Sequence, residues 1–185
     1  MGIRAWLLVV LAVSGAWAAG AAAAPVTWHL QDVAFADGAF AIGSFDYDAA
    51  SQSTSDWNIF VSGGDTATFP DVNYNATLPD HHSEVGALLD LQMLFFEIGS
   101  GASERIFALA STADLGGASG TVALEVGSFN HSYECFNCTP YRFVTSGTLV
   151  PEPSPVAACG MAGLVLGTIA RARRRHRIDA THASA

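Results

Sequence analysis

Hydrophobic and polar residues alternate through most of the middle of the chain. Residues 26–30 alternate, residues 33–35 lead into Asp37-Gly38, and residues 40–47 alternate again around Ile42 and Phe45. An Asp-Gly dipeptide between two alternating runs is typical of a hairpin turn. The pattern therefore predicts two antiparallel strands joined by a tight turn.

Further runs of the same kind follow at intervals. Residues 57–61 end at Gly63 and Gly64, and residues 105–110, 121–126 and 141–149 are further candidate strands. Residues 85–98 are apolar without clear helical amphipathicity, so they fit either two strands or a buried helix. Turn residues separate the runs at spacings typical of sandwiches. We predict an all-β domain over residues 24–149, with a β-sandwich as the expected architecture.

The N-terminus has the three parts of a secretory signal. Arg4 precedes an apolar run over residues 5–19, and small residues fill positions 20–24. Cleavage after Ala23, with Ala21 at the −3 position, fits signal peptidase and leaves Pro25 at the tolerated +2 position. An uncleaved membrane anchor is the alternative, but the run is short for a span of ~20 residues. We expect residues 1–23 to be a signal peptide, exported by the Sec machinery and removed.

The C-terminus carries a second candidate targeting signal. Pro151-Glu152-Pro153 holds the chain extended, and an apolar run over residues 156–170 follows. As a helix that run is ~22 Å long against a ~30 Å hydrocarbon core, so it predicts a short transmembrane helix. A basic cluster then predicts a cytoplasmic stop under the positive-inside rule. The cluster consists of Arg171, Arg173, Arg174, Arg175 and Arg177, and a polar tail, residues 178–185, follows it.

This order of proline motif, short apolar helix and arginine cluster, over residues 150–177, resembles the PEP-CTERM sorting signal of Gram-negative bacteria. The resemblance implies recognition by exosortase, a membrane-embedded enzyme thought to cut near Pro151-Glu152-Pro153. It also implies a host that makes exopolysaccharide or biofilm matrix. We therefore expect a single-pass intermediate in the inner membrane and a product at the cell surface or outside the cell. Residues 28–48 resemble the start of many ectodomains in that group, and an ordinary tail anchor with a proline-rich linker is the alternative.

Charge is distributed unevenly. The chain has no lysine, and residues 25–150 keep only Arg105 and Arg142 against fifteen Asp and Glu, a formal charge of −13. A field of this sign repels phosphate backbones, so we expect no nucleic-acid partner. A negative field suits a soluble extracellular surface, or a domain that binds cations.

Cys135 and Cys138 form a Cys-x-x-Cys pair. In the oxidising compartment reached after export, this spacing predicts a small structural disulfide. A redox-active pair would want a thioredoxin-like βαβ context, which the sequence does not indicate. A metal site that adds His131 is a third interpretation. Cys159 lies within the apolar segment, and we interpret it as an inert residue of the predicted helix.

Two other groups of residues suggest binding. Asp46, Asp48 and Asp56 flank a serine-rich loop and would suit calcium, although a plain polar loop explains them equally. Several aromatic residues would serve either as core or as a platform for sugar rings. These are Trp28, Trp57, Tyr47, Tyr74, Tyr133 and Tyr141.

Motifs of common hydrolases are missing from the sequence. It contains no Gly-x-Ser-x-Gly and no His-Glu-x-x-His, and we interpret residues 79–84, with His81 and His82, as an exposed loop. The expected function is a non-enzymatic surface or matrix protein, associated with exopolysaccharide and without a cofactor. A carbohydrate- or calcium-binding module and a secreted hydrolase are the alternatives.

Overall fold

The described part of the chain is built from β-strands. A computed structural model describes residues 24–128 and 131–153, and no α-helix occurs within those residues. The elements in chain order are β1 Val26–Phe35, β2 Phe40–Asp48, β3 Ser53–Ser62, β4 Val72–Asn75, β5 His81–Leu88, β6 Leu91–Ile98, the 3-10 turn η1 Gly101–Ser103, β7 Arg105–Ser111, β8 Val122–Ala123, β9 Tyr133–Phe136 and β10 Tyr141–Pro151.

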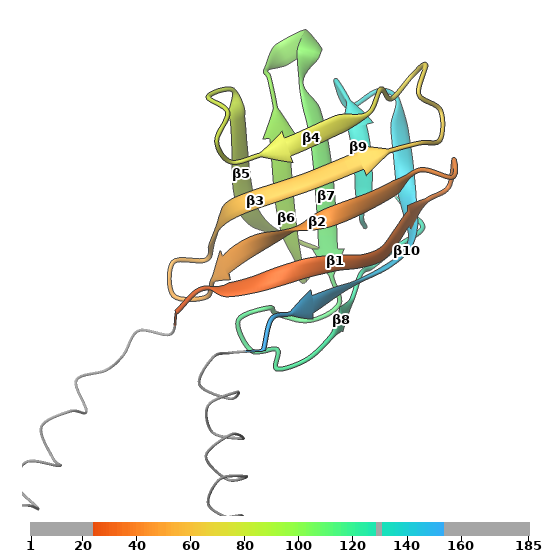
Figure 1. The fold of residues 1–185 in the computed structure, drawn as a ribbon. Helices are drawn as coiled ribbons and strands as arrows, with labels where there is room; N and C mark the ends of the chain where they lie inside the picture. The colour runs from red at the N-terminus through yellow and green to blue at the C-terminus, as the bar shows by residue number, and fades with distance from the viewer. Residues whose placement is uncertain (1–23, 129–130, 154–185) are drawn as a thin grey trace, which may run out of the picture. The chain divides into compact units, whose positions relative to one another are not determined.

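All of these strands belong to one antiparallel sheet. Its order is β4-β3-β2-β1-β10-β9-β7-β6-β5, and β8 pairs with β10. Figure 1 shows β1–β4 crossing in front of β5, β6, β7 and β9 at a steep angle. The two halves approach each other at β3 and β5, where Thr54 Oγ1 donates a hydrogen bond to Ser83 Oγ over 2.8 Å. The sheet therefore nearly closes into a barrel.

The core lies between the two halves of the sheet. On the first half, alternate residues of each strand point inward, so Trp28 and Phe45 are fully buried. Phe45 meets Phe96 from the second half, with ring centroids 5.4 Å apart, and Phe35 meets Phe107 at 5.9 Å. Such tilted aromatic pairs stabilise a core beyond the area that they bury.

Two bulges bend the first half of the sheet. The register shifts between Leu30 and Val33 in β1, and between Ser44 and Asp46 where β2 faces β3. Asp32 and Asp56 occupy the extra positions with φ of 54° and 48°. Aspartate tolerates this left-handed conformation better than most residues, because its short side chain can bond the local backbone.

The prediction of an all-β domain is confirmed. The hairpin at Asp37-Gly38 forms, and the ambiguous run 85–98 consists of two strands, β5 and β6, joined by a turn. The expected strand over residues 121–126 is shorter, since only Val122–Ala123 pairs. The interpretation of residues 79–84 as a loop is wrong from His81 onward, because β5 begins there and pairs with β6.

The two predicted targeting signals, at the N-terminus and the C-terminus, lie almost wholly outside the described residues. The signal peptide (1–23), the apolar segment 156–170, the arginine cluster and the polar tail are not described. Of the sorting motif, Pro151 ends β10, and Glu152 and Pro153 are exposed. No helix within residues 24–128 and 131–153 has the length and apolar character needed to cross a membrane.

Candidate functional site

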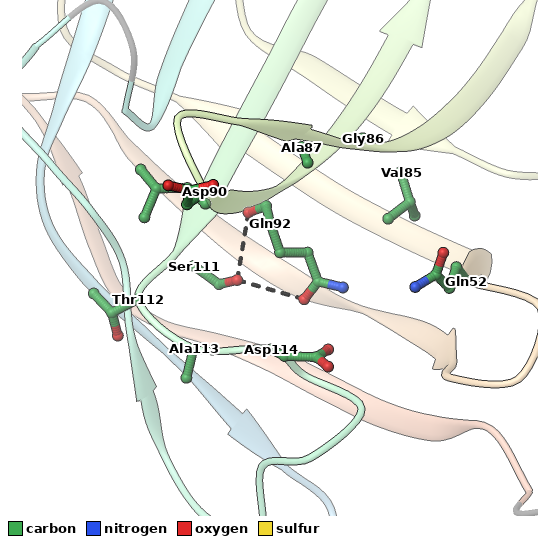
Figure 2. A pocket seen from close by; sticks show the side chains of 11 residues that line it. Gln52, Val85, Gly86, Ala87, Asp90, Gln92, Ser111, Thr112, Ala113 and Asp114 are labelled. Carbon is green, nitrogen blue, oxygen red and sulfur yellow. Dashed lines mark hydrogen bonds between the residues drawn. The ribbon is translucent and has the colours of Figure 1, made fainter.

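A pocket of about 510 Å³ opens at one end of the sheet. It lies where the β5–β6 hairpin, the β2–β3 turn and the segment after β7 meet (Figure 2). Its size is in the range of ~300–1,000 Å³ typical of small-molecule sites. The lining residues are Gln52, Val85, Gly86, Ala87, Asp90, Leu91, Gln92, Ser111, Thr112, Ala113 and Asp114.

Gln92 forms a fixed polar surface within the pocket. Its Nε2 donates to Tyr47 Oη over 2.6 Å, and its Oε1 accepts from the backbone N–H of Leu115 over 3.0 Å. The buried hydroxyl of Ser111 lies 3.4 Å from Gln92 O and 3.5 Å from Gln92 Oε1. Because three groups hold this amide, its orientation is set before any ligand arrives.

Two carboxylates give the pocket a negative charge. Asp90 lies in the β5–β6 turn, where Leu89 and Asp90 both have positive φ, and Asp114 Oδ1 accepts from Gly116 N over 2.9 Å. Both are exposed. Burial raises the pKa of the nearby Tyr47 phenol, and the negative charges of Asp114 and Asp48 raise it further. The lining contains no cationic residue that would offset this field.

The two arginines of the described domain are bound elsewhere, in a buried cluster around Glu134. Arg105 Nε donates to Glu134 Oε1 over 2.7 Å, and Arg142 Nε donates to Glu134 Oε2 over 2.6 Å. Tyr74 Oη donates to Glu134 Oε1 over 2.7 Å. All four side chains are buried, so the carboxylate is satisfied entirely by protein groups.

The same cluster anchors the loop between β3 and β4. Arg105 Nη1 donates to Pro70 O over 2.5 Å, and Arg142 Nη1 lies 3.2 Å from Asp37 Oδ2. The Phe69 ring lies against both guanidinium groups, at 5.9 Å from Arg105 and 4.7 Å from Arg142. Burial raises the pKa of Asp37, but the bonds from backbone N–H groups and Arg142 outweigh it, and the net shift is downward. Two carboxylates thus balance two guanidinium groups in a structural role.

Sequence reasoning did not identify this cluster or the pocket. A signal for the cluster existed, because Glu134 lies between apolar neighbours in an alternating strand while the domain has only two arginines. That combination indicates a buried, paired carboxylate. No comparable signal marked the pocket, whose lining comes from three segments that are separate in the sequence.

The predicted disulfide is not formed in the structure. Cys135 and Cys138 are free thiols, the first buried and the second half-buried, and their side chains hydrogen-bond to each other. Burial, followed by the neighbouring Cys138, raises the pKa of the Cys135 thiol. Redox-active pairs are favoured at a helix N-terminus, whereas Cys135 lies in strand β9 and Cys138 in the turn that follows it, so the redox interpretation gains no support from the fold. His131 Nδ1 lies 2.8 Å from the backbone O of Val126.

The three aspartates considered for calcium do not converge. Asp46 accepts a hydrogen bond from Thr27 Oγ1 over 2.7 Å, and Asp48 accepts one from Ala50 N over 2.8 Å. Asp56 is the bulge residue of β3. Within the described ranges, no group of three or more His, Cys, Asp or Glu is arranged to hold a metal ion. Calcium binding stays a prediction.

Adjacent histidines at the start of β5 point to opposite faces, as strand geometry requires. His81 Nδ1 accepts from Asn75 N over 3.1 Å, with only 6% of its side chain exposed. His82 Nε2 lies 2.6 Å from Glu97 Oε2 on the outer face. The pair is therefore not a ready chelate or catalytic dyad.

The aromatic residues divide between core and surface. Trp28, Tyr47 and Tyr74 are core residues, and Trp57 packs against the core. Tyr133 and Tyr141 are half-buried on the outer face, with ring centroids 5.5 Å apart. The six aromatics therefore form no single platform.

Comparisons with known proteins give no relative: no family model, no curated protein and no solved structure matches this chain.

Proposed function

We propose that this chain is an exported, non-enzymatic surface or matrix protein, sorted through residues 150–177. The observation that carries the proposal is the order of proline motif, short apolar segment and arginine cluster. The exposure of Glu152 and Pro153 directly after β10 supports it, because a processing enzyme needs an accessible, extended peptide. Exosortase is the proposed partner, and exopolysaccharide the proposed surroundings.

The proposed order of events follows from the two termini. Signal peptidase removes residues 1–23, and the domain of residues 24–149 folds outside the cytoplasm as an all-β ectodomain. Residues 156–170 hold it in the inner membrane until the tail is cut. Oxidation of Cys135 and Cys138 to a disulfide belongs to the same proposal, since that compartment favours it.

The chemistry of the domain supports a role without catalysis. Its two arginines bind Glu134 and serve the fold. Both arginines are thus used by the fold, which leaves neither to bind a substrate at the pocket, so the hydrolase hypothesis gains no support from them.

Fractionation of the native host tests the sorting proposal. The full chain is compared with a triple variant, Pro151→Ala, Glu152→Ala and Pro153→Ala, and with a triple control beyond the proposed signal, Asp179→Ala, Thr181→Ala and Ser184→Ala. We expect the wild type and the control at the surface or in the medium, and the triple variant in the inner membrane. Delivery of the triple variant to the surface at the wild-type level would show that the motif does not direct sorting.

A second function, saccharide binding, is favoured by the pocket. Its mixed lining of amides, carboxylates, two hydroxyls and apolar side chains suits a polyhydroxylated ligand. Calcium remains the other ligand considered for the domain, through Asp46, Asp48 and Asp56.

A further inference from the structure

We infer that the pocket binds one pyranose unit of a glycan that carries no acid group at that unit, either a neutral or an amino sugar. This inference rests on the second proposed function and names its site and its ligand class. The pocket of about 510 Å³ is open to solvent. One sugar of a longer glycan can therefore occupy it while the rest of the glycan extends into solvent.

The polar groups of the pocket suit paired hydroxyls. Figure 2 shows the Gln92 amide and the Asp114 carboxylate reaching into the same space, with Gln52 at the far side. A carboxylate has two oxygens and can accept from neighbouring hydroxyl groups of a sugar ring, whereas the Gln92 amide has one Nε2–H left to donate to a hydroxyl. Gln92 is already held by Tyr47, Leu115 and Ser111, so binding loses little of its side-chain entropy.

The apolar part of the lining suits the C–H face of the ring. Val85 and Ala87 lie along β5, and Ala113 lies on the segment after β7. These short side chains leave room for a ring between the two segments. The amides and carboxylates would then bond the hydroxyl groups at the ring edge, a division of roles typical of small-molecule sites.

Charge decides which sugars are accepted. Asp90 and Asp114 line the pocket, Asp48 lies close enough to affect the same Tyr47 phenol, and the lining has no cation. An anionic sugar would place its carboxylate in this negative field without a partner. A neutral hydroxyl or an ammonium group instead donates to these carboxylates, which strengthens the hydrogen bond.

Calorimetric titration of the full chain in detergent tests the inference. The probes are methyl glycosides of glucose, galactose, mannose and glucosamine, and of glucuronate and galacturonate as acidic counterparts. We expect at least one neutral or amino glycoside to bind with a Kd of about 1 mM. The acidic counterparts should bind at least about 10-fold more weakly.

Three variants locate the binding. Asp114→Asn keeps an oxygen to accept from Gly116 N and should weaken binding about 10-fold. Ala87→Trp fills the pocket from an exposed strand position and should abolish binding, even if Asp114→Asn fails to fold. The control, Asp80→Asn, removes the same charge just before β5, at the other end of that strand from Asp90, and should leave the Kd unchanged.

The possible results separate the inference from the proposals beneath it. Absence of binding by every glycoside up to about 10 mM, ten times the expected Kd, overturns the inference. Binding that Ala87→Trp and Asp114→Asn both leave unchanged also overturns it, while saccharide binding by the domain survives. Equal or tighter binding of the acidic glycosides overturns the assigned ligand class. The sorting proposal is judged only by fractionation, so its failure is distinguishable from all three.

Discussion

Arg142 donates a hydrogen bond from Nε to Glu134 Oε2 over 2.6 Å, with both side chains buried. The pair joins neighbouring strands, since Arg142 lies opposite Glu134 in the β9–β10 register. Arg105, opposite the end of β9, completes the arrangement from β7. An acidic domain with only two cations therefore uses both to stabilise one internal site.

Neutralising Glu134 should severely destabilise the domain. Glu134→Gln leaves two buried guanidinium groups without their carboxylate, and removing one partner of a buried pair costs about 3–5 kcal/mol. Urea unfolding of the variant should show this loss in the free energy of unfolding. The matched control, Glu84→Gln on the exposed face of β5, should change it by less than about 0.5 kcal/mol. Equal stability of the two variants would refute the structural role of the cluster.

A methyl group at Gly43 should disrupt the pairing of β2 with β3. Gly43 has φ of 137°, and a Cβ there would lie 2.1 Å from the backbone O of Asn58 and 2.8 Å from Ile59 Cα. Backbone cannot yield as a flexible side chain does, so Gly43→Ala should cost about 3 kcal/mol or more. Thermal unfolding against Gly120→Ala is the measurement, because a Cβ at Gly120 meets nothing within 4 Å. A melting temperature for Gly43→Ala equal to that of the control would contradict this account of the sheet.

Phenolate formation should be delayed in the folded protein. Burial raises the pKa of each of the four tyrosines, that of Tyr141 to about 12. Since ordinary tyrosines titrate near ~10, a spectrophotometric titration of the folded chain should show little phenolate at that pH. The urea-unfolded chain should show half-ionisation there.

The same shifts set a pH dependence of stability. A folded pKa above the unfolded value means that folding favours the neutral phenol. The contribution of Tyr141 is therefore complete below pH ~10 and is lost as the pH rises toward about 12. Urea midpoints that stay constant across this window would argue against the shifts.

The cysteine pair should be oxidised in protein recovered from outside the cytoplasm. Cys135 and Cys138 already contact each other through their side chains. A disulfide therefore needs only an oxidant that accepts two electrons from the two thiols, and the compartment outside the cytoplasm is oxidising. Intact mass should be about 2 Da below that of the reduced chain. Alkylation of both thiols without prior reduction would show that the pair stays reduced, as it is in the structure.

How far the sequence predicts the fold can be seen in particular strands. Alternation identified β1 and β2, because one face of each meets the core and the other does not. The β5–β6 hairpin stayed ambiguous, since its turn places Leu89 and Asp90 at positive φ without the usual glycine. The four-residue strands β4 and β9 are too short for a periodic signal.

Binding geometry was harder to foresee than strands. The pocket depends on which turns the register brings together, and Gln52, Gln92 and Asp114 are far apart in sequence. Asp46 and Asp48 were binding candidates because they are close in sequence. Neither lines the pocket, although the negative charge of Asp48 raises the pKa of Tyr47. Long-range pairing, which local patterns do not encode, decides both cases.

Mass spectrometry of the mature protein from its native cells tests the central claim most directly. The account predicts a chain that starts at Ala24 and ends close to Pro151-Glu152-Pro153, recovered from the surface or the medium. Recovery of the full 185-residue chain from the cytosol, with both termini intact, would contradict it.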